Sequence, residues 1–165
     1  MCAKLIVEIP EELLREVEKR GLDIVDIIIN AIERVDPSGG VKLRVELAVR
    51  FLNEAREYLN RGDAVQASEK AYKAIEETVK ALAEKYNLPE YQQAVKDGGW
   101  FAYLLQRASN TLSTMLGEWV AAGWASAYAV RVWGFHEGKL EVKDLTTYIK
   151  IIEDTVNKAL QILSK

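Results

Sequence analysis

Cysteine and histidine are almost absent from this chain of 165 residues, which has one of each, Cys2 and His136. A single cysteine excludes an intramolecular disulfide, and with a single histidine it excludes the usual zinc sites, which need several such ligands. Acidic residues show no metal-ligand spacing, and the pairs Glu76–Glu77 and Glu153–Asp154 are interpreted as solvated helix faces. We therefore expect no metal site and no cofactor site, and the scarcity of cysteine fits a reducing cytoplasm.

Proline, glycine and long apolar runs are also scarce. Three prolines and ten glycines fall between periodic stretches, and the proportions of hydrophobic (49%) and charged (28%) residues are those of an ordinary globular domain. The 12 uncharged residues Trp119–Val130 are fewer than the roughly 20 that a membrane span requires. No basic and apolar leader precedes Leu5, so we expect no signal peptide and no contact with a membrane.

Two short helices are predicted near the N-terminus. Pro10 suits the first position of a helix, because its missing N–H group has no partner there, and that helix ends at Gly21. The side chain of Asp23 can cap a second helix over Ile24–Val35. The turn-rich stretch Asp36–Gly40 then closes this segment.

The residues before these helices, Lys4–Ile9, alternate in polarity and predict one short strand. The strand and two helices resemble the ribbon-helix-helix unit of antitoxins and small repressors, in which the strand pairs with its copy and reads DNA. The outward side chains here would be Lys4, Ile6 and Glu8, and residues 1–40 hold five basic and nine acidic residues, a net charge of −4. Because DNA phosphates repel such a negatively charged segment, we expect it not to bind DNA. We expect it instead to dimerise or to cover the bundle.

The rest of the chain, residues 41–165, repeats apolar residues at the three- and four-residue spacing of helices. Gly62 and Asp63 separate two long helices, which must lie antiparallel because the joint is short. Pro89 opens a short helix that ends at Gly98–Gly99. The last helix has an unbroken apolar seam, interpreted as core packing: Leu145, Ile149, Ile152, Val156, Ala159 and Leu163. The sequence thus predicts an all-α protein, with a strand and helical hairpin over residues 1–40 joined to a helical bundle over residues 41–165 as one compact unit.

Aromatic and small residues gather in the penultimate helix. Trp119, Trp124, Tyr128 and Trp133 are interpreted as core or interface residues. Small residues recur at a four-residue spacing, where they would let a neighbouring helix approach closely: Gly117, Ala121, Ala125 and Ala129.

The stretch Gly62–Pro89, with Gln-Ala-Ser-Glu-Lys at Gln66–Lys70, resembles the PaREP family of crenarchaeal paralogous proteins. The likeness continues through Val132–Glu137 and covers roughly Val45–Leu163. That family in turn resembles a branch of the HEPN superfamily, bundles of four to five helices that usually dimerise. The resemblance implies a homodimeric HEPN-like bundle. Members of the superfamily include metal-independent RNases, toxins and helpers of minimal nucleotidyltransferases.

The HEPN RNase signature is an arginine followed, after four to six residues, by a histidine. Arg131 and His136 match it, which implies that they are catalytic, although the residue after the arginine is usually polar in active members and is Val132 here. A neutral imidazole can take the proton of a ribose 2′-hydroxyl group, and a guanidinium can stabilise the crowded phosphorus without a metal. On an ideal α-helix these side chains lie roughly 140° apart. They converge if Gly134 unwinds the helix, or if each faces a copy across a dimer interface.

Three functions remain open from the sequence. The first is a homodimeric interaction or adaptor module linked to RNA or nucleotides, and the second is a metal-independent RNase that uses Arg131 and His136. The third is a nucleotide-binding partner of a nucleotidyltransferase, which rests on the superfamily alone because the sequence has no glycine-rich phosphate loop.

Overall fold

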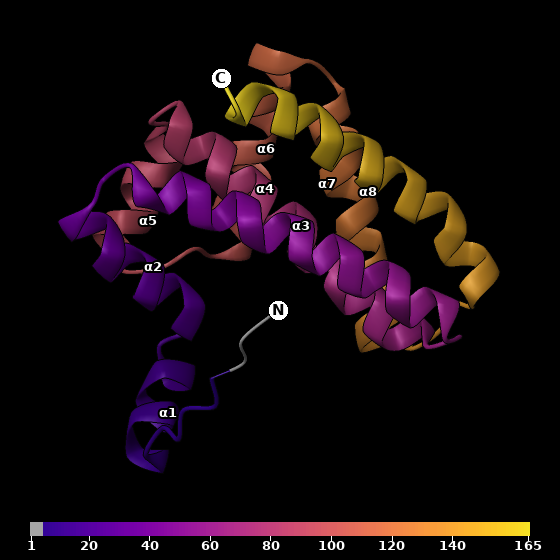
Figure 1. Ribbon diagram of the computed structural model, residues 1–165, viewed down its shortest axis with the longest axis horizontal. Coiled ribbons are helices and arrows are strands. Elements are labelled where there is room, and N and C mark those ends of the chain that lie inside the picture. The colour runs from indigo at the N-terminus through magenta and orange to yellow at the C-terminus, as the bar shows by residue number, and fades with distance from the viewer. Residues whose placement is uncertain (1–4) are drawn as a thin grey trace.

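The computed structural model describes residues 5–165, and every regular element in this range is a helix (Figure 1). In chain order the elements are α1 (Glu11–Lys19), α2 (Ile24–Val35), α3 (Gly39–Asn60), α4 (Ala64–Lys85), α5 (Pro89–Asp97), α6 (Ala102–Leu116), α7 (Trp119–Ala129), the π-helix η1 (Val130–His136) and α8 (Val142–Leu163). The prediction of an all-α fold is confirmed.

The predicted N-terminal strand is not formed over residues 5–9, which are exposed and have no regular structure. Lys4, at the start of that prediction, lies outside the described residues. A strand is stable only when its backbone N–H and C=O groups pair with a second strand, and residues 5–165 contain none. Alternating polarity is therefore insufficient for a strand here.

Both short helices form, and α2 has its predicted bounds. Pro10 is the N-cap of α1 and not its first residue, and α1 ends before Gly21, which has a φ of +64°. Asp23 caps α2, since its Oδ1 accepts a hydrogen bond from the backbone N–H of Asp26 at 3.1 Å. Figure 1 shows α1 standing away from the bundle.

The predicted turn Asp36–Gly40 is shorter than expected, because α3 already begins at Gly39. Side chains of the neighbouring helices come very close to Gly40. A Cβ atom there would lie 2.2 Å from Oε1 of Glu33 and 2.5 Å from Oε1 of Glu84, so α2, α3 and α4 meet closely here and a larger residue would displace these side chains.

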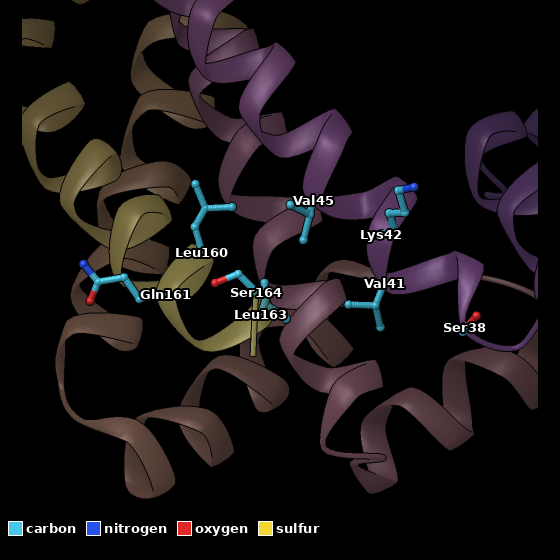
Figure 2. A pocket seen from close by; sticks show the side chains of 8 residues that line it. All are labelled: Ser38, Val41, Lys42, Val45, Leu160, Gln161, Leu163 and Ser164. Atoms are coloured by element: carbon cyan, nitrogen blue, oxygen red, sulfur yellow. The ribbon is translucent and has the colours of Figure 1, made fainter.

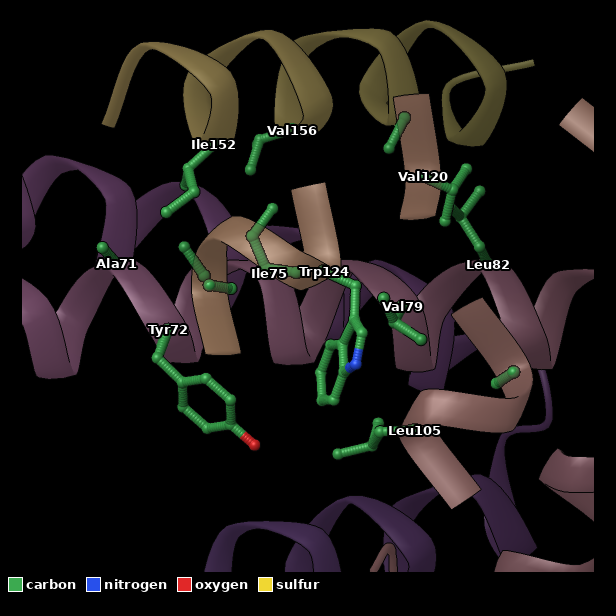
Figure 3. Close-up of a cluster of buried hydrophobic side chains, with 14 of the residues drawn as sticks. Ala71, Tyr72, Ile75, Val79, Leu82, Leu105, Val120, Trp124, Ile152 and Val156 are labelled. Atoms are coloured by element: carbon green, nitrogen blue, oxygen red, sulfur yellow. The ribbon is translucent and has the colours of Figure 1, made fainter. Parts of the chain in front are cut away.

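The central element of the bundle is α4, which packs against α3, α6, α7, α8 and η1. Asp63 caps the N-terminus of α4 as the sequence predicted, because its Oδ1 accepts a hydrogen bond from the N–H of Gln66 at 3.0 Å. Figure 3 shows α4 side chains such as Ile75 and Val79 meeting Trp124 of α7 and Ile152 of α8. The core interpretation of the α8 seam is confirmed, with five of its members buried and Leu163 partly buried: Leu145, Ile149, Ile152, Val156 and Ala159.

The small-residue stripe of α7 does not pack as predicted, since Ala125 is exposed and Gly117, Ala121 and Ala129 are only half-buried. The buried residues of α7 are instead Val120, Gly123, Trp124, Ser126 and Ala127. Gly123 is the point of close approach, where a Cβ atom would lie 2.4 Å from Oγ1 of Thr155 on α8. None of the helices within residues 5–165 is long and apolar enough to cross a membrane.

The aromatic residues divide between interior and surface. Trp124 is buried and donates from Nε1 to Oε1 of Gln106 at 2.8 Å, and Trp119 packs against the core. Tyr128 and Trp133, in contrast, are about half exposed. Burial in the core is therefore confirmed for Trp124 and Trp119, and an interface role for Tyr128 and Trp133 stays a prediction.

A buried network of charges fastens α2 to the bundle. Asp26 accepts hydrogen bonds from Arg44 Nη1 at 2.9 Å and from Lys80 Nζ at 3.0 and 2.9 Å. Glu77 accepts from the same two cations, at 2.9 and 3.1 Å. Glu77 is thus buried, and its interpretation as a solvated residue is wrong. A buried carboxylate is tolerated because two cations compensate its charge.

Candidate functional site

The π-helix η1 brings Arg131 and His136 together within one chain. Nε of Arg131 donates a hydrogen bond to Nε2 of His136 at 3.3 Å. In a π-helix the backbone hydrogen bonds join residues five apart, as between the N–H of Glu137 and the C=O of Val132 at 2.9 Å. Residues 131 and 136 therefore share one face, where an α-helix would separate them. This corresponds to the first of the two routes expected from the sequence, the one that alters the helix near Gly134.

Gly134 sits where η1 crosses α4. A Cβ atom on Gly134 would lie 2.0 Å from Oγ and 2.7 Å from Cβ of Ser68, which is fully buried and donates from Oγ to the C=O of Ala64 at 2.7 Å. Only glycine lets the two backbones come this close. The contact holds η1, and with it Arg131 and His136, against the bundle.

Tyr72 of α4 is the third residue at this point. Nη1 of Arg131 donates to the Tyr72 hydroxyl oxygen at 2.5 Å, and the guanidinium carbon lies 4.4 Å from the centre of the Tyr72 ring. The ring itself is buried beside Trp124, with their centroids 6.0 Å apart (Figure 3). Burial and the negative charge of Glu76 raise the pKa of Tyr72 to about 12, so the phenol keeps its proton at neutral pH.

These three side chains line a pocket of about 320 Å³. One wall is the turn between α1 and α2, with Gly21 and Asp23, and another is the start of α6, with Trp100 and Phe101. The floor is a stripe of α4 that includes Tyr72. The pocket is therefore built from four separate parts of the chain.

A larger hollow of about 530 Å³ lies between the start of α3 and the end of α8 (Figure 2). Val41, Val45 and Leu160 supply apolar lining, and Lys42 is the one titratable residue among those that line it. Such a lining offers no pair of groups for acid–base chemistry. The smaller pocket holds the Arg131 and His136 pair that the sequence indicated, and it is therefore the candidate site.

The greater part of the chain matches the model of a protein family. The model of the archaeal PaREP1/PaREP8 family matches residues 43–156. The chain belongs to the archaeal PaREP1/PaREP8 family. The matched range contains Tyr72, Arg131 and His136 but not the wall at Gly21 and Asp23. The site residues of this PaREP protein thus lie in the part of the chain that matches the family. The resemblance to the PaREP family seen in the sequence is confirmed.

A crystal structure of a protein from Sulfolobus solfataricus is similar to this PaREP protein. The two share 37% sequence identity with a TM-score of 0.64, over 70% of this chain and 94% of the other. A comparison with curated proteins gives no match. These comparisons show the family and the fold of the chain.

The charges around the pocket leave Arg131 without an acidic partner. No carboxylate within residues 5–165 lies within 4.0 Å of its guanidinium, whose hydrogen-bond partners are the Tyr72 hydroxyl group and the His136 imidazole. Of the three acids that line the pocket, Glu69 pairs with Lys73 at 3.0 Å and Glu76 with Lys80 at 2.9 Å, whereas Asp23 accepts a hydrogen bond from the N–H of Asp26 at 3.1 Å. Of the five N–H groups of a guanidinium, two are used here, so three can bind an anion.

His136 is exposed and contacts Nε of Arg131, whereas Tyr72 contacts Nη1. Because its Nε2 accepts the Arg131 hydrogen bond, the geometry places the imidazole proton on Nδ1. An anion that takes up the Nε–H group of Arg131 releases Nε2, which can then accept a proton. Among the described residues, no three histidine, cysteine or acidic side chains are grouped in a way that would hold a metal ion.

Sequence reasoning identified Arg131 and His136 but missed Tyr72. Its position on α4, next to Ala71 and three residues before Ile75, indicates an inward-facing side chain. Nothing in the local sequence links it to an arginine 59 residues away. The paired cation Lys80, which engages Glu76 beside the pocket, was missed for the same reason.

Proposed function

We propose that this protein is a HEPN-like helical module of the cytoplasm whose pocket binds a phosphate group of RNA and cleaves the adjacent bond without a metal. The observation that carries the proposal is the Arg131 guanidinium, which is bonded only to neutral groups and lies 3.3 Å from the His136 imidazole. A cation without an acidic partner attracts a phosphate, and a neutral imidazole beside it can accept a proton.

The reaction follows from these two groups. Nε2 of His136 takes the proton of the ribose 2′-hydroxyl group, and the 2′-oxygen forms a bond to the neighbouring phosphorus. The bond between phosphorus and the 5′-oxygen breaks, and the 5′-oxygen takes up a proton. Arg131 stabilises the extra negative charge of the five-coordinate phosphorus through the Nε–H group that it no longer gives to His136 and through its remaining N–H groups. The products are a 2′,3′-cyclic phosphate and a 5′-hydroxyl end.

The test is incubation with structured RNA in EDTA, followed by identification of the product ends. We expect 2′,3′-cyclic phosphate from the wild type. His136→Ala should reduce the rate by roughly 10²-fold, the scale of lost general acid–base help. Arg131→Lys should fail to restore activity, because an ammonium lacks the planar fork of a guanidinium. Arg61→Lys, at an exposed arginine outside the pocket, is the matched control and should leave the rate unchanged.

Two outcomes would contradict the RNase proposal: no cleavage by the wild type, or unchanged cleavage in both site variants. In that case a thermal-shift screen with nucleotides tests whether the pocket belongs to a nucleotide-binding partner of a nucleotidyltransferase. A stabilisation that Arg131→Ala abolishes would support this alternative.

The second candidate function is a homodimeric adaptor, and the observation that favours it is the uncovered face of α1 and α2. α1 has no buried residue, Leu13 is 59% exposed and Ile28 of α2 is 54% exposed. An isolated helix needs about 12–15 residues to persist in water, and α1 has nine. A second copy of the chain would cover this face.

Light scattering at micromolar concentration checks the dimer. We expect twice the chain mass for the wild type and the monomer mass for Leu13→Lys, which places a charge on the uncovered face. Met115→Lys, at an exposed apolar residue of α6 away from this face, is the control and should remain dimeric. A monomeric wild type would remove the adaptor proposal in its homodimeric form.

A further inference from the structure

We infer that Tyr72 is the general acid of this site, donating the proton that the leaving 5′-oxygen takes up when its bond to phosphorus breaks. The inference rests on the proposed RNA cleavage and adds a residue to it. His136 alone supplies the base, and the reaction also needs a proton donor on the other side of the phosphorus.

The arrangement around Arg131 places Tyr72 on that other side. His136 contacts Nε of the guanidinium at 3.3 Å, whereas the Tyr72 hydroxyl oxygen contacts Nη1 at 2.5 Å. These are different arms of the planar fork. A phosphate that takes up the Nε–H group, and so releases Nε2 of His136, together with the remaining N–H groups therefore lies between the imidazole and the phenol. Attacking and leaving oxygens are roughly in line across phosphorus, so a base and an acid on opposite sides match the reaction.

The hydroxyl group of Tyr72 is held as a donor. Its oxygen accepts from Arg131, so its own hydrogen points elsewhere, and a hydrogen bond accepted from a cation strengthens the O–H group as a donor. The raised pKa of Tyr72 keeps the proton in place until a strong base forms. The departing alkoxide is a stronger base than a phenolate, so the transfer is favourable.

The nearby Glu76 does not take this proton, because it is engaged elsewhere. Lys80 Nζ lies 2.9 Å from Oε1 of Glu76 and is itself buried. The carboxylate is thus compensated by a cation of the interior. The phenol hydrogen remains available to a ligand in the pocket.

The proton balance closes over one cycle. The 2′-hydroxyl proton goes to His136, and the Tyr72 proton goes to the 5′-oxygen. The imidazolium then returns its proton to the phenolate through water, which restores both residues. No oxidant, metal or further reactant enters.

The test compares two substrates in EDTA, uridylyl-3′,5′-adenosine and uridine 3′-(4-nitrophenyl phosphate). The nitrophenolate leaves without a proton, so a lost general acid affects only the dinucleotide. We expect Tyr72→Phe to lower kcat for the dinucleotide by about 10²-fold and for the nitrophenyl ester by less than about threefold. Tyr91→Phe, at a tyrosine that bonds Glu33 outside the pocket, is the control and should behave as the wild type.

Tyr72→Leu separates the hydroxyl group from the ring. Because it also removes the ring beneath the guanidinium, it should slow both substrates, as Arg131→Ala does. Equal losses on both substrates for Tyr72→Phe, or no loss on the dinucleotide, would overturn the inference while leaving the proposed function intact. If instead Arg131→Ala and His136→Ala change neither substrate, the proposed function itself fails.

A measurement on the unaltered protein keeps the inference testable should Tyr72→Phe fold poorly. The rate is followed across a series of uridine 3′-aryl phosphates whose leaving groups differ in basicity. With an acid assisting departure, the rate should depend only weakly on leaving-group basicity. A steep dependence that extends to the most basic leaving groups would contradict the inference.

Discussion

Substituting Gly134 by alanine should damage both the fold and the site, because the added methyl group has no space. Its Cβ would lie 2.0 Å from Oγ and 2.7 Å from Cβ of Ser68, well inside van der Waals contact. Ser68 belongs to the central helix α4 and is fully buried, so η1 must move away from it. Overpacking of this kind costs about 1–3 kcal/mol. In a chain of this length that corresponds to a melting temperature lower by roughly 2–12 °C.

The site should suffer more than the fold. Arg131 and His136 flank Gly134 on η1, and Arg131 reaches Tyr72 on α4 by a single hydrogen bond and a ring contact. Moving η1 outward by a few tenths of an ångström or more separates these groups. We therefore expect Gly134→Ala to lose RNA cleavage by about 10²-fold, the scale of a misplaced catalytic group.

A second substitution shows whether the clash is the cause. Ser68→Gly removes both atoms that the new methyl group meets, at a cost of about 1 kcal/mol for glycine within a helix. The double variant should be more stable than the sum of the single effects by about 1–2 kcal/mol, and it should regain cleavage. Denaturant unfolding and product analysis measure both. The reasoning is refuted if Gly134→Ala behaves as the wild type, or if Ser68→Gly restores neither stability nor cleavage.

Three further outcomes follow from the N-terminal half of the molecule. Lys80→Met leaves Asp26 with one of its two cations, and breaking a buried pair should lower the free energy of unfolding by about 3–5 kcal/mol in urea. Burial and the charge of Glu33 raise the pKa of Glu84 to about 7, so this carboxyl loses its proton at a higher pH in the folded than in the unfolded protein. The stability that this group contributes should therefore fall as pH rises from about 4.5 to about 7. Glu84→Gln should remove that fall and be more stable than the wild type at pH 8 by about 1–2 kcal/mol, allowing for solvent screening; equal pH profiles would contradict this. The acidic segment 1–40 should give no gel shift with duplex DNA, whereas nanomolar binding would show that the charge argument is wrong.

The sequence by itself determined most of the helices and their ends. The caps at Asp23 and Asp63 and the break at Gly62 depend on contacts within a few residues, so their signals are local. The α8 seam was also predictable, because a 3.6-residue repeat marks the buried face of any helix that has a core to face. The spacing of Arg131 and His136, which matches the HEPN RNase signature, predicted these two as site residues.

Local patterns failed where a second part of the chain was needed. Alternating polarity in residues 5–9 could not make a strand without a partner. The small-residue stripe did not predict which side of α7 faces α8, because the close contact with Thr155 is made by Gly123. Sequence spacing constrains a face, but the neighbouring element decides whether that face is buried.

The working geometry of the site was decided by tertiary structure alone. Arg131 and His136 share a face because η1 is a π-helix, and η1 lies close to α4 because Gly134 meets Ser68 there. Tyr72 reaches Arg131 across 59 residues of sequence. Lys80 is buried only because carboxylates from α2 and α4 close around it. In each case the energy depends on groups that are distant in sequence and adjacent in space, which a local pattern does not record.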